Sequence, residues 1–122
     1  MQRKKILSAI VLFLSIGTSS VYAEEREVQH MIEHIHWLGH DTFKIKGEKV
    51  IYTDPFKIKK NDSADIILIT HEHYDHCSPE DVKKIQKKDT VIVAPPDCAG
   101  KLKGDVMTVK PGDKLSVQEI EI

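Results

Sequence analysis

The feature that most constrains this chain is a run of apolar residues that passes directly into a segment rich in histidine. Residues Ile66–Ile69 are bulky and mostly β-branched, which predicts a buried strand. The next segment places three imidazoles and one carboxylate in a short loop: His71, His73, Asp75 and His76. Ser78 and Pro79 then have the form of a helix start, with Ser as the N-cap and Pro at the first helical position. The chain therefore predicts a strand, a ligand-bearing loop and a helix in direct succession.

The donor atoms of this loop indicate a metal site. His71 and His73 are two residues apart, so they leave the end of the strand on the same side. Imidazole nitrogen together with carboxylate oxygen suits zinc, and iron or manganese also fit, whereas magnesium and calcium prefer oxygen ligands. The alternative is a polar surface loop that is histidine-rich by chance, and its position directly after an apolar strand argues against that interpretation.

The spacing His71-x-His73-x-Asp75-His76 resembles the HxHxDH signature of the metallo-β-lactamase superfamily. Two upstream segments, Trp37–His40 and Tyr52–Pro55, are similar to the branch that contains ascorbate-6-phosphate lactonase and N-acyl-phosphatidylethanolamine phospholipase D. The resemblance covers about residues 32–122. It implies an α/β fold, namely the N-terminal half of an αββα sandwich with a mixed sheet and short helices.

The resemblance also implies an activity and a set of ligands. His71 and His73 would hold one metal ion, and Asp75 and His76 a second, so one or two zinc ions are expected. A metal-bound hydroxide would attack an ester, lactone, amide or phosphodiester in a small-molecule substrate. Asp75 is the candidate catalytic residue because it could also orient this hydroxide. The residues that carry the chemistry are therefore expected to lie within one loop.

Two further residues are candidates for supporting the ligands. Asp54 matches an aspartate that, in the resembled family, lies behind the metal loop and orients it through hydrogen bonds. Its alternative is a simple Asp-Pro turn, because Pro55 ends the preceding strand. His40 follows Gly39 in a turn, and it either points into the mouth of the site or caps that turn.

The family takes further metal ligands from the second half of its domain, and no histidine follows His76 in this sequence. We therefore expect the chain to correspond to a fragment, the N-terminal part of such a hydrolase. The alternative function is a catalytically incompetent metal-binding remnant or interaction module. A half-domain of this kind would expose one apolar sheet face and a strand edge, which predicts self-association.

The N-terminal segment has the form of a secretory signal peptide. A basic start at Arg3–Lys5 precedes the apolar run Ile6–Ile16, and small residues end the segment at Ala23. We expect cleavage after Ala23 and export to the periplasm or the medium. The alternative is an uncleaved anchor, but the apolar run is short for a stable membrane span. The expected organisation is a signal peptide over residues 1–23, a lead-in over 24–31 and the truncated domain over 32–122.

Charge and cysteine content narrow the expected partners. The net charge of −1 provides no basic surface, so nucleic acid is not an expected partner. Cys77 and Cys98 would meet an oxidising compartment after export, where a disulfide could persist. The alternatives are two buried free thiols, or Cys77 as an additional soft ligand. His34 and His36 alternate with apolar residues and are interpreted as part of a polar strand face without a metal role.

The remaining elements follow from local patterns. Phe43 and Ile45 are expected to point inward from a strand that forms a hairpin with the next one. A helical crossover after the histidine loop predicts that the strands on either side of it are parallel. The predicted strands cover residues 31–38, 42–46, 49–53, 64–70, 90–94, 106–109 and 115–122, with a break at 118–119, and the predicted helices cover 79–88 and 97–102.

Overall fold

The computed structural model describes residues 21–59 and 62–122. The chain divides into two units, Met1–Glu33 and His34–Ile122. The described part of the first unit is a helix over residues 21–33, so the strand predicted from residue 31 begins later, and the lead-in is helical. Most of the predicted signal peptide lies outside the described residues, and its cleavage stays a prediction. No helix within 21–59 or 62–122 is long and apolar enough to cross a membrane.

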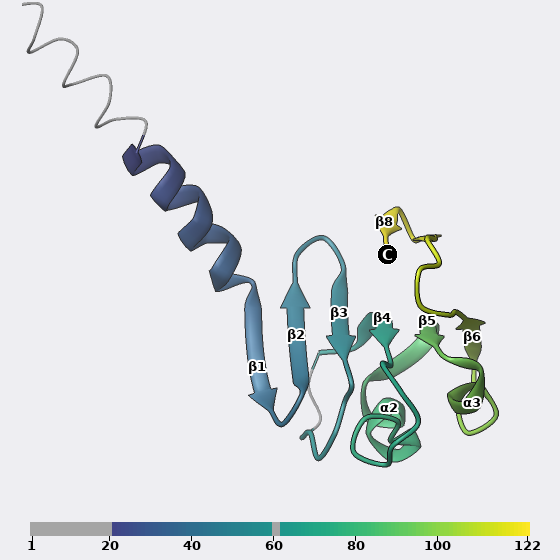
Figure 1. Cartoon of the computed structure of the whole chain (residues 1–122). Helices are drawn as coiled ribbons and strands as arrows, with labels where there is room; N and C mark the ends of the chain where they lie inside the picture. Colours follow the sequence, from purple (N-terminus) through teal and green to yellow (C-terminus); the bar gives the residue numbers. More distant parts are fainter. Residues whose placement is uncertain (1–20, 60–61) are drawn as a thin grey trace, which may run out of the picture. The chain divides into compact units, whose positions relative to one another are not determined.

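The second unit is built on one mixed sheet whose spatial order β1-β2-β3-β4-β5-β6 is also the order of the chain (Figure 1). Its strands are β1 (Ile35–Gly39), β2 (Thr42–Lys46), β3 (Val50–Thr53), β4 (Ala64–Leu68), β5 (Gln86–Ala94) and β6 (Asp105–Thr108). The first three strands pair antiparallel, and β3 to β6 pair parallel. This arrangement confirms the predicted α/β class, the hairpin of β2 with β3 and the parallel crossover from β4 to β5.

Two short helices connect the parallel strands. Helix α2 (Pro79–Ile85) begins after Ser78, whose hydroxyl accepts a hydrogen bond from the Asp81 amide. It ends earlier than predicted because Gln86 adopts an extended conformation and starts β5. Helix α3 (Pro96–Ala99) is a single turn between β5 and β6. The helix start predicted from Ser78 and Pro79 is therefore correct. The end predicted at residue 88 is wrong, because the segment after Ile85 belongs to β5.

The two faces of the sheet are covered differently. On one face, Tyr52, Ile67 and Ile92 are fully buried in a cluster that includes Val82 and Ile85 of α2. On the other face, a smaller cluster packs around three buried side chains, Ile66, Val93 and Val117. The last of these belongs to a small hairpin of β7 (Ser116–Val117) and β8 (Ile120–Glu121), whose turn is the predicted break at residues 118–119.

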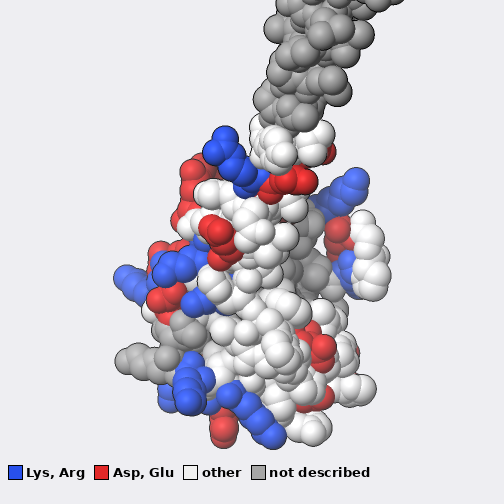
Figure 2. Space-filling model, turned by 90° about the vertical axis from the view of Figure 1, so that its left-hand side faces the viewer, with Lys and Arg blue, Asp and Glu red and all other residues white. Residues whose placement is uncertain are grey.

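The inward direction predicted for β2 is wrong. Thr42 and Lys44 are buried, while Phe43 is 40% exposed. Lys44 lies opposite Tyr52 and pairs with Asp62, so a polar side chain occupies the covered face. Strict alternation then turns Phe43 outward. Viewed from the β1 side, the molecule shows a broad area without Lys, Arg, Asp or Glu (Figure 2), and Ile35 and Trp37 of β1 are exposed as well.

Candidate metal centre

The candidate site lies at the end of the sheet where β1, β3 and β4 have their carboxyl ends. His40 follows β1, Asp54 follows β3, and the loop with His71 and His76 follows β4. Strands β1, β3 and β4 all run in the same direction, because β2 is antiparallel to both of its neighbours and β3 is parallel to β4. Their carboxyl ends therefore lie at the same end of the sheet. Three separate segments of the chain come together there.

Asp54 holds the start of the histidine loop. Its side chain is buried, with Oδ1 accepting a hydrogen bond from the Thr70 amide at 2.8 Å. Oδ2 accepts from the Thr70 hydroxyl at 2.6 Å and from Nδ1 of His76 at 2.8 Å. The Asp54 backbone has a φ of 38°, a left-handed conformation, directly after β3. One carboxylate thus fixes the loop backbone, a hydroxyl and one imidazole, which is the position that the sequence predicts for Asp54.

These contacts also indicate which ring nitrogen of His71 carries a proton. The Thr70 hydroxyl has one proton, which it donates to the Asp54 carboxylate, so it accepts from Nδ1 of His71 at 2.9 Å. Nε2 of His71 therefore keeps its lone pair, and it faces Nδ1 of His73 at 3.1 Å. Nδ1 of His73 can donate a hydrogen bond to this lone pair, and when both nitrogens are unprotonated a cation can take the place of the proton. The two nitrogens are therefore close enough to share one proton or to face one ion.

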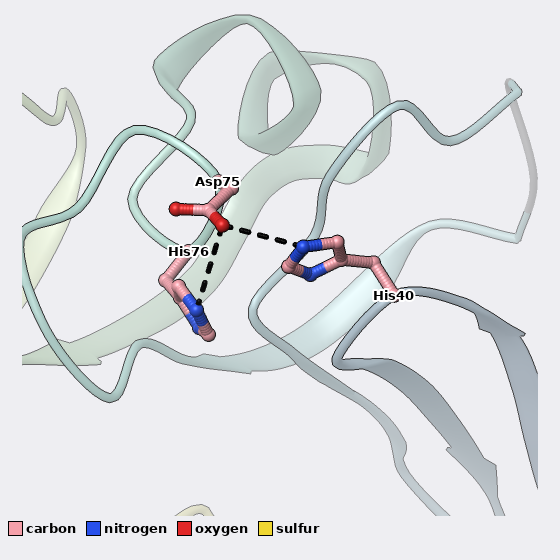
Figure 3. A group of neighbouring side chains, drawn as sticks. All are labelled: His40, Asp75 and His76. Atoms are coloured by element: carbon pink, nitrogen blue, oxygen red, sulfur yellow. Dashed lines mark ion pairs between the residues drawn. The ribbon is translucent and has the colours of Figure 1, made fainter.

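The other two predicted ligands meet a residue from a distant segment. Within the ranges that the structure describes, His40, Asp75 and His76 form a group whose donor atoms lie within 4.8 Å of one another (Figure 3). Nε2 of His40 is 3.3 Å from Oδ2 of Asp75, and Nε2 of His76 is 3.9 Å from the same oxygen. The rings of His71 and His76 are 3.9 Å apart between centroids, so this group adjoins the His71–His73 pair.

The electrostatics of the site favour positive charge. A hydrogen bond to Asp54 raises the pKa of His76; burial opposes this shift, and the charges of Asp75 and Asp41 add to it. Oδ2 of Asp41 is 2.9 Å from Nδ1 of His40 and 3.5 Å from Nε2 of His76. Three carboxylates thus surround two imidazoles, an environment that suits a cation.

The rim of the site carries aromatic side chains and one ion pair. Phe56 packs edge-on against His40 and Tyr74, with ring centroids 5.3 and 5.8 Å apart, and Tyr74 is 79% exposed. Glu72 points away from the ligands and pairs with Lys101 at 3.2 Å. The loop is therefore tied to the segment after α3 on one side, and it presents an apolar surface to solvent on the other.

Both cysteines are free thiols and are buried in the cluster beneath α2. Burial and the neighbouring Cys77 raise the pKa of Cys98 to about 12. Of the three interpretations left open by the sequence, the structure has the two buried thiols. Cys77 is not a member of the group formed by His40, Asp75 and His76.

Sequence reasoning left the position of His40 undecided, and the structure places its side chain against Asp75. No spacing rule relates a turn after the first strand to a loop after the fourth. The only available signal was the position of His40 directly after Gly39 at a strand end. The arrangement offers nitrogen and carboxylate donors to one or two divalent ions of the transition series, and a water molecule among them would be polarised.

Comparison with known proteins gives consistent matches. A model of the beta-lactamase superfamily domain matches residues 34–122. A metal-dependent hydrolase of Thermoplasma volcanium is 44% identical over 60 residues, which are 43% of this chain and 26% of the relative. One of Thermoplasma acidophilum is 33% identical over 98 residues, 70% of this chain and 43% of the relative. The chain therefore spans less than half the length of these curated relatives.

A solved structure gives the same result for the fold. A protein of Parabacteroides distasonis, described as a metal-dependent hydrolase, superposes with a TM-score of 0.60 at 35% sequence identity. The superposition covers 66% of this chain and 38% of the solved chain.

Proposed function

The chain belongs to the beta-lactamase superfamily, and from this membership and the geometry of its histidine loop we propose that it is part of a zinc-dependent hydrolase. Zinc is the proposed metal because neutral imidazoles with a carboxylate form its usual catalytic ligand set. The substrate is proposed to be a small molecule with an ester, lactone, amide or phosphodiester bond. The observation that carries the proposal is the approach of the His71 and His73 nitrogens to 3.1 Å.

The residues present fit such a metal. His71 and His73 would hold one ion, and Asp75 and His76 would contribute to a second. When bound, zinc supplies a Lewis acid that lowers the pKa of water to about 7. The protein's own contribution is to orient the rings, since Asp54 holds Nδ1 of His76 directly and Nδ1 of His71 through Thr70, which directs the Nε2 atoms toward the site.

Two further groups have roles in the proposed reaction. In Figure 3, one oxygen of Asp75 faces the imidazoles and the other points away from them. This second oxygen is free to accept a hydrogen bond from a water molecule and so to orient it. The exposed ring of Tyr74, packed edge-on against Phe56, would contact an apolar part of the substrate.

The test uses the full chain and measures metal content together with hydrolysis. After dialysis, zinc is quantified by mass spectrometry in the wild type, in His71→Ala/His73→Ala and in His36→Ala. The last variant is the matched control, because it removes an exposed histidine of β1. Turnover is followed with p-nitrophenyl acetate, a homoserine lactone, an anilide and bis-p-nitrophenyl phosphate. We expect bound zinc and turnover of one substrate in the wild type and the control. In the double variant we expect loss of turnover and of the zinc held by His71 and His73.

Two other results would change the proposal. Zinc binding without turnover would favour the alternative function, a metal-binding module without catalysis. A folded wild type that binds no zinc, iron or manganese would contradict the proposal altogether. Circular dichroism of each sample establishes that the variants are folded.

We also propose that the protein is exported. The support is compositional, namely the basic start, the short apolar run and the small residues that end at Ala23. Mass spectrometry of the protein recovered from its native cells should find an N-terminus at Glu24. Recovery of the intact N-terminal segment in the cell interior would contradict this proposal.

A further inference from the structure

His40 is held in the manner of a metal ligand. Its Nδ1 lies 2.9 Å from Oδ2 of Asp41, within ion-pair distance of that carboxylate. Its Nε2 lies 3.3 Å from Oδ2 of Asp75. Metal-binding histidines commonly donate their second ring N–H to a carboxylate or a carbonyl, which fixes the tautomer and the direction of the ring.

The same arrangement is repeated on His76. Its Nδ1 donates to Asp54 at 2.8 Å, and its Nε2 faces the same oxygen of Asp75 at 3.9 Å. His40 lies after β1, whereas His76 lies in the loop after β4. The carboxylate next to Nδ1 is Asp41 for His40 and Asp54 for His76. The Nε2 atoms of both residues nevertheless face one Asp75 oxygen, and Nε2 of His76 also lies 3.5 Å from Oδ2 of Asp41, so imidazole and carboxylate donors converge on one point.

The backbone of the turn before β2 (Thr42–Lys46) places His40 next to Asp75. Gly39 and His40 have φ values of 105° and 51°, so both are in the left-handed region. The indole N–H of Trp37 donates to the carbonyl oxygen of His40 at 2.8 Å. The ring of His40 also packs edge-on against Phe56 and His76. A histidine that merely capped the turn would not need this positioning.

We propose that His40 is a protein ligand of the metal held by Asp75 and His76, and that Asp41 is its positioning residue. The site then consists of two imidazoles and one carboxylate, a set that binds zinc, iron or manganese in the divalent state. All three ligands lie within residues 40–76. This inference rests on the proposed metal-dependent function and assigns it a ligand outside the histidine loop.

The test is a titration of the metal-free full chain with Co²⁺, whose visible absorption reports on ligand number and type, repeated with Zn²⁺ by calorimetry. The variants are His40→Ala, His40→Gln and Asp41→Asn. His36→Ala and Asp105→Asn are matched controls, because both residues are exposed. Asp105 is the first residue of β6 and lies at the amino ends of the parallel strands, away from the candidate site. The thermal midpoint of each metal-free sample reports on folding.

We expect the wild type to bind two equivalents of metal. Asp41→Asn should weaken one equivalent roughly 10- to 100-fold, as is typical of a lost support to a ligand, without changing the midpoint. Both His40 variants should weaken the same equivalent by more and change its Co²⁺ spectrum. His71→Ala/His73→Ala should lose the other equivalent and keep this one.

The outcomes separate the two proposals. If His40→Ala and His40→Gln bind both equivalents with wild-type affinity and spectra, His40 is not a ligand, and the proposed hydrolase function stands unaffected. If the folded wild type binds no metal at all, the proposed function fails and this inference fails with it.

Discussion

The two donor groups of the site contain similar atoms but are held differently. Asp54 and Asp41 contact the rings of His76 and His40 directly, so two of the ligands in the His40–Asp75–His76 group are fixed by carboxylates. In the His71–His73 pair, Nδ1 of His71 is linked to Asp54 through the Thr70 hydroxyl. Metal affinity is therefore expected to depend on supporting residues in a different way for each group.

The largest effect is expected for the residue that the two groups share. Asp54→Ala removes the acceptor of three hydrogen bonds, and we expect it to lower the free energy of unfolding by about 3 kcal/mol, since buried donors are left without partners. Both metal equivalents should be weakened, which would abolish the difference between the groups. Urea unfolding and zinc titration measure the two effects, with Asp105→Asn as the control. Wild-type affinity at either group would show that Asp54 does not support it.

A second carboxylate, Asp81, supports the fold without contacting the ligands. It accepts hydrogen bonds from the backbone amides of Lys57 and Ile58, from the Ser78 hydroxyl and from the Lys84 ammonium group. We expect Asp81→Asn to lower the free energy of unfolding by about 2 kcal/mol at neutral pH, because charged acceptors form the stronger bonds. Metal affinity should change little, which would separate structural carboxylates from those that hold ligands.

The contribution of Asp81 to stability depends on pH. Burial raises the pKa of Asp81, but the bonds from Lys84, Ser78 and Lys57 outweigh it and hold the pKa below its ordinary value of 3.8. The ionised form therefore stabilises the fold above pH 3.8, and this contribution is lost as the pH falls through the lowered pKa. Unfolding of the wild type and Asp81→Asn between pH 7 and pH 2 should give curves that converge only at the acid end. Convergence near neutral pH would contradict the assignment.

Thr70→Val sharpens the comparison, because it removes the hydroxyl and keeps the backbone amide that Asp54 also binds. The free energy of unfolding should fall by about 1 kcal/mol, the usual net contribution of one hydrogen bond. The His71–His73 equivalent should weaken roughly 10- to 100-fold, whereas the His40–Asp75–His76 equivalent should change less. Equal weakening of both equivalents in the Co²⁺ titration would show that Thr70 supports them alike.

The smallest effect is expected for Trp37→Phe. The side chain is 67% exposed, and the substitution removes only the indole N–H that binds the His40 carbonyl oxygen. The change in the free energy of unfolding should stay below about 0.5 kcal/mol, as for most exposed positions. A few-fold loss of affinity confined to the equivalent held by His40 would show that the turn itself contributes. Loss at the His71–His73 equivalent would contradict the separation of the groups.

Much of the histidine loop and its surroundings could be predicted from the sequence, because the signals lie in neighbouring residues. The apolar run before His71, the helix start at Ser78 and the position of Asp54 after a strand are all signalled by neighbouring residues. The approach of His40 to Asp75 was not, since it depends on sheet register and on a left-handed turn. Phe43 was assigned to the wrong face for a related reason: alternation identifies two faces of a strand but not which one the rest of the chain covers.

The order of the sheet has a consequence for how the molecule is assembled. Each strand from β2 to β6 pairs with the strand that precedes it in the chain, so every pairing step requires only a short loop closure. His40, Asp54 and the histidine loop all lie between β1 and the start of α2. During synthesis from the N-terminus, every residue of the candidate metal centre is therefore made before β5 and β6. A metal ion bound there would stabilise these first strands, which would couple metal supply to the folding of the N-terminal part of the sheet.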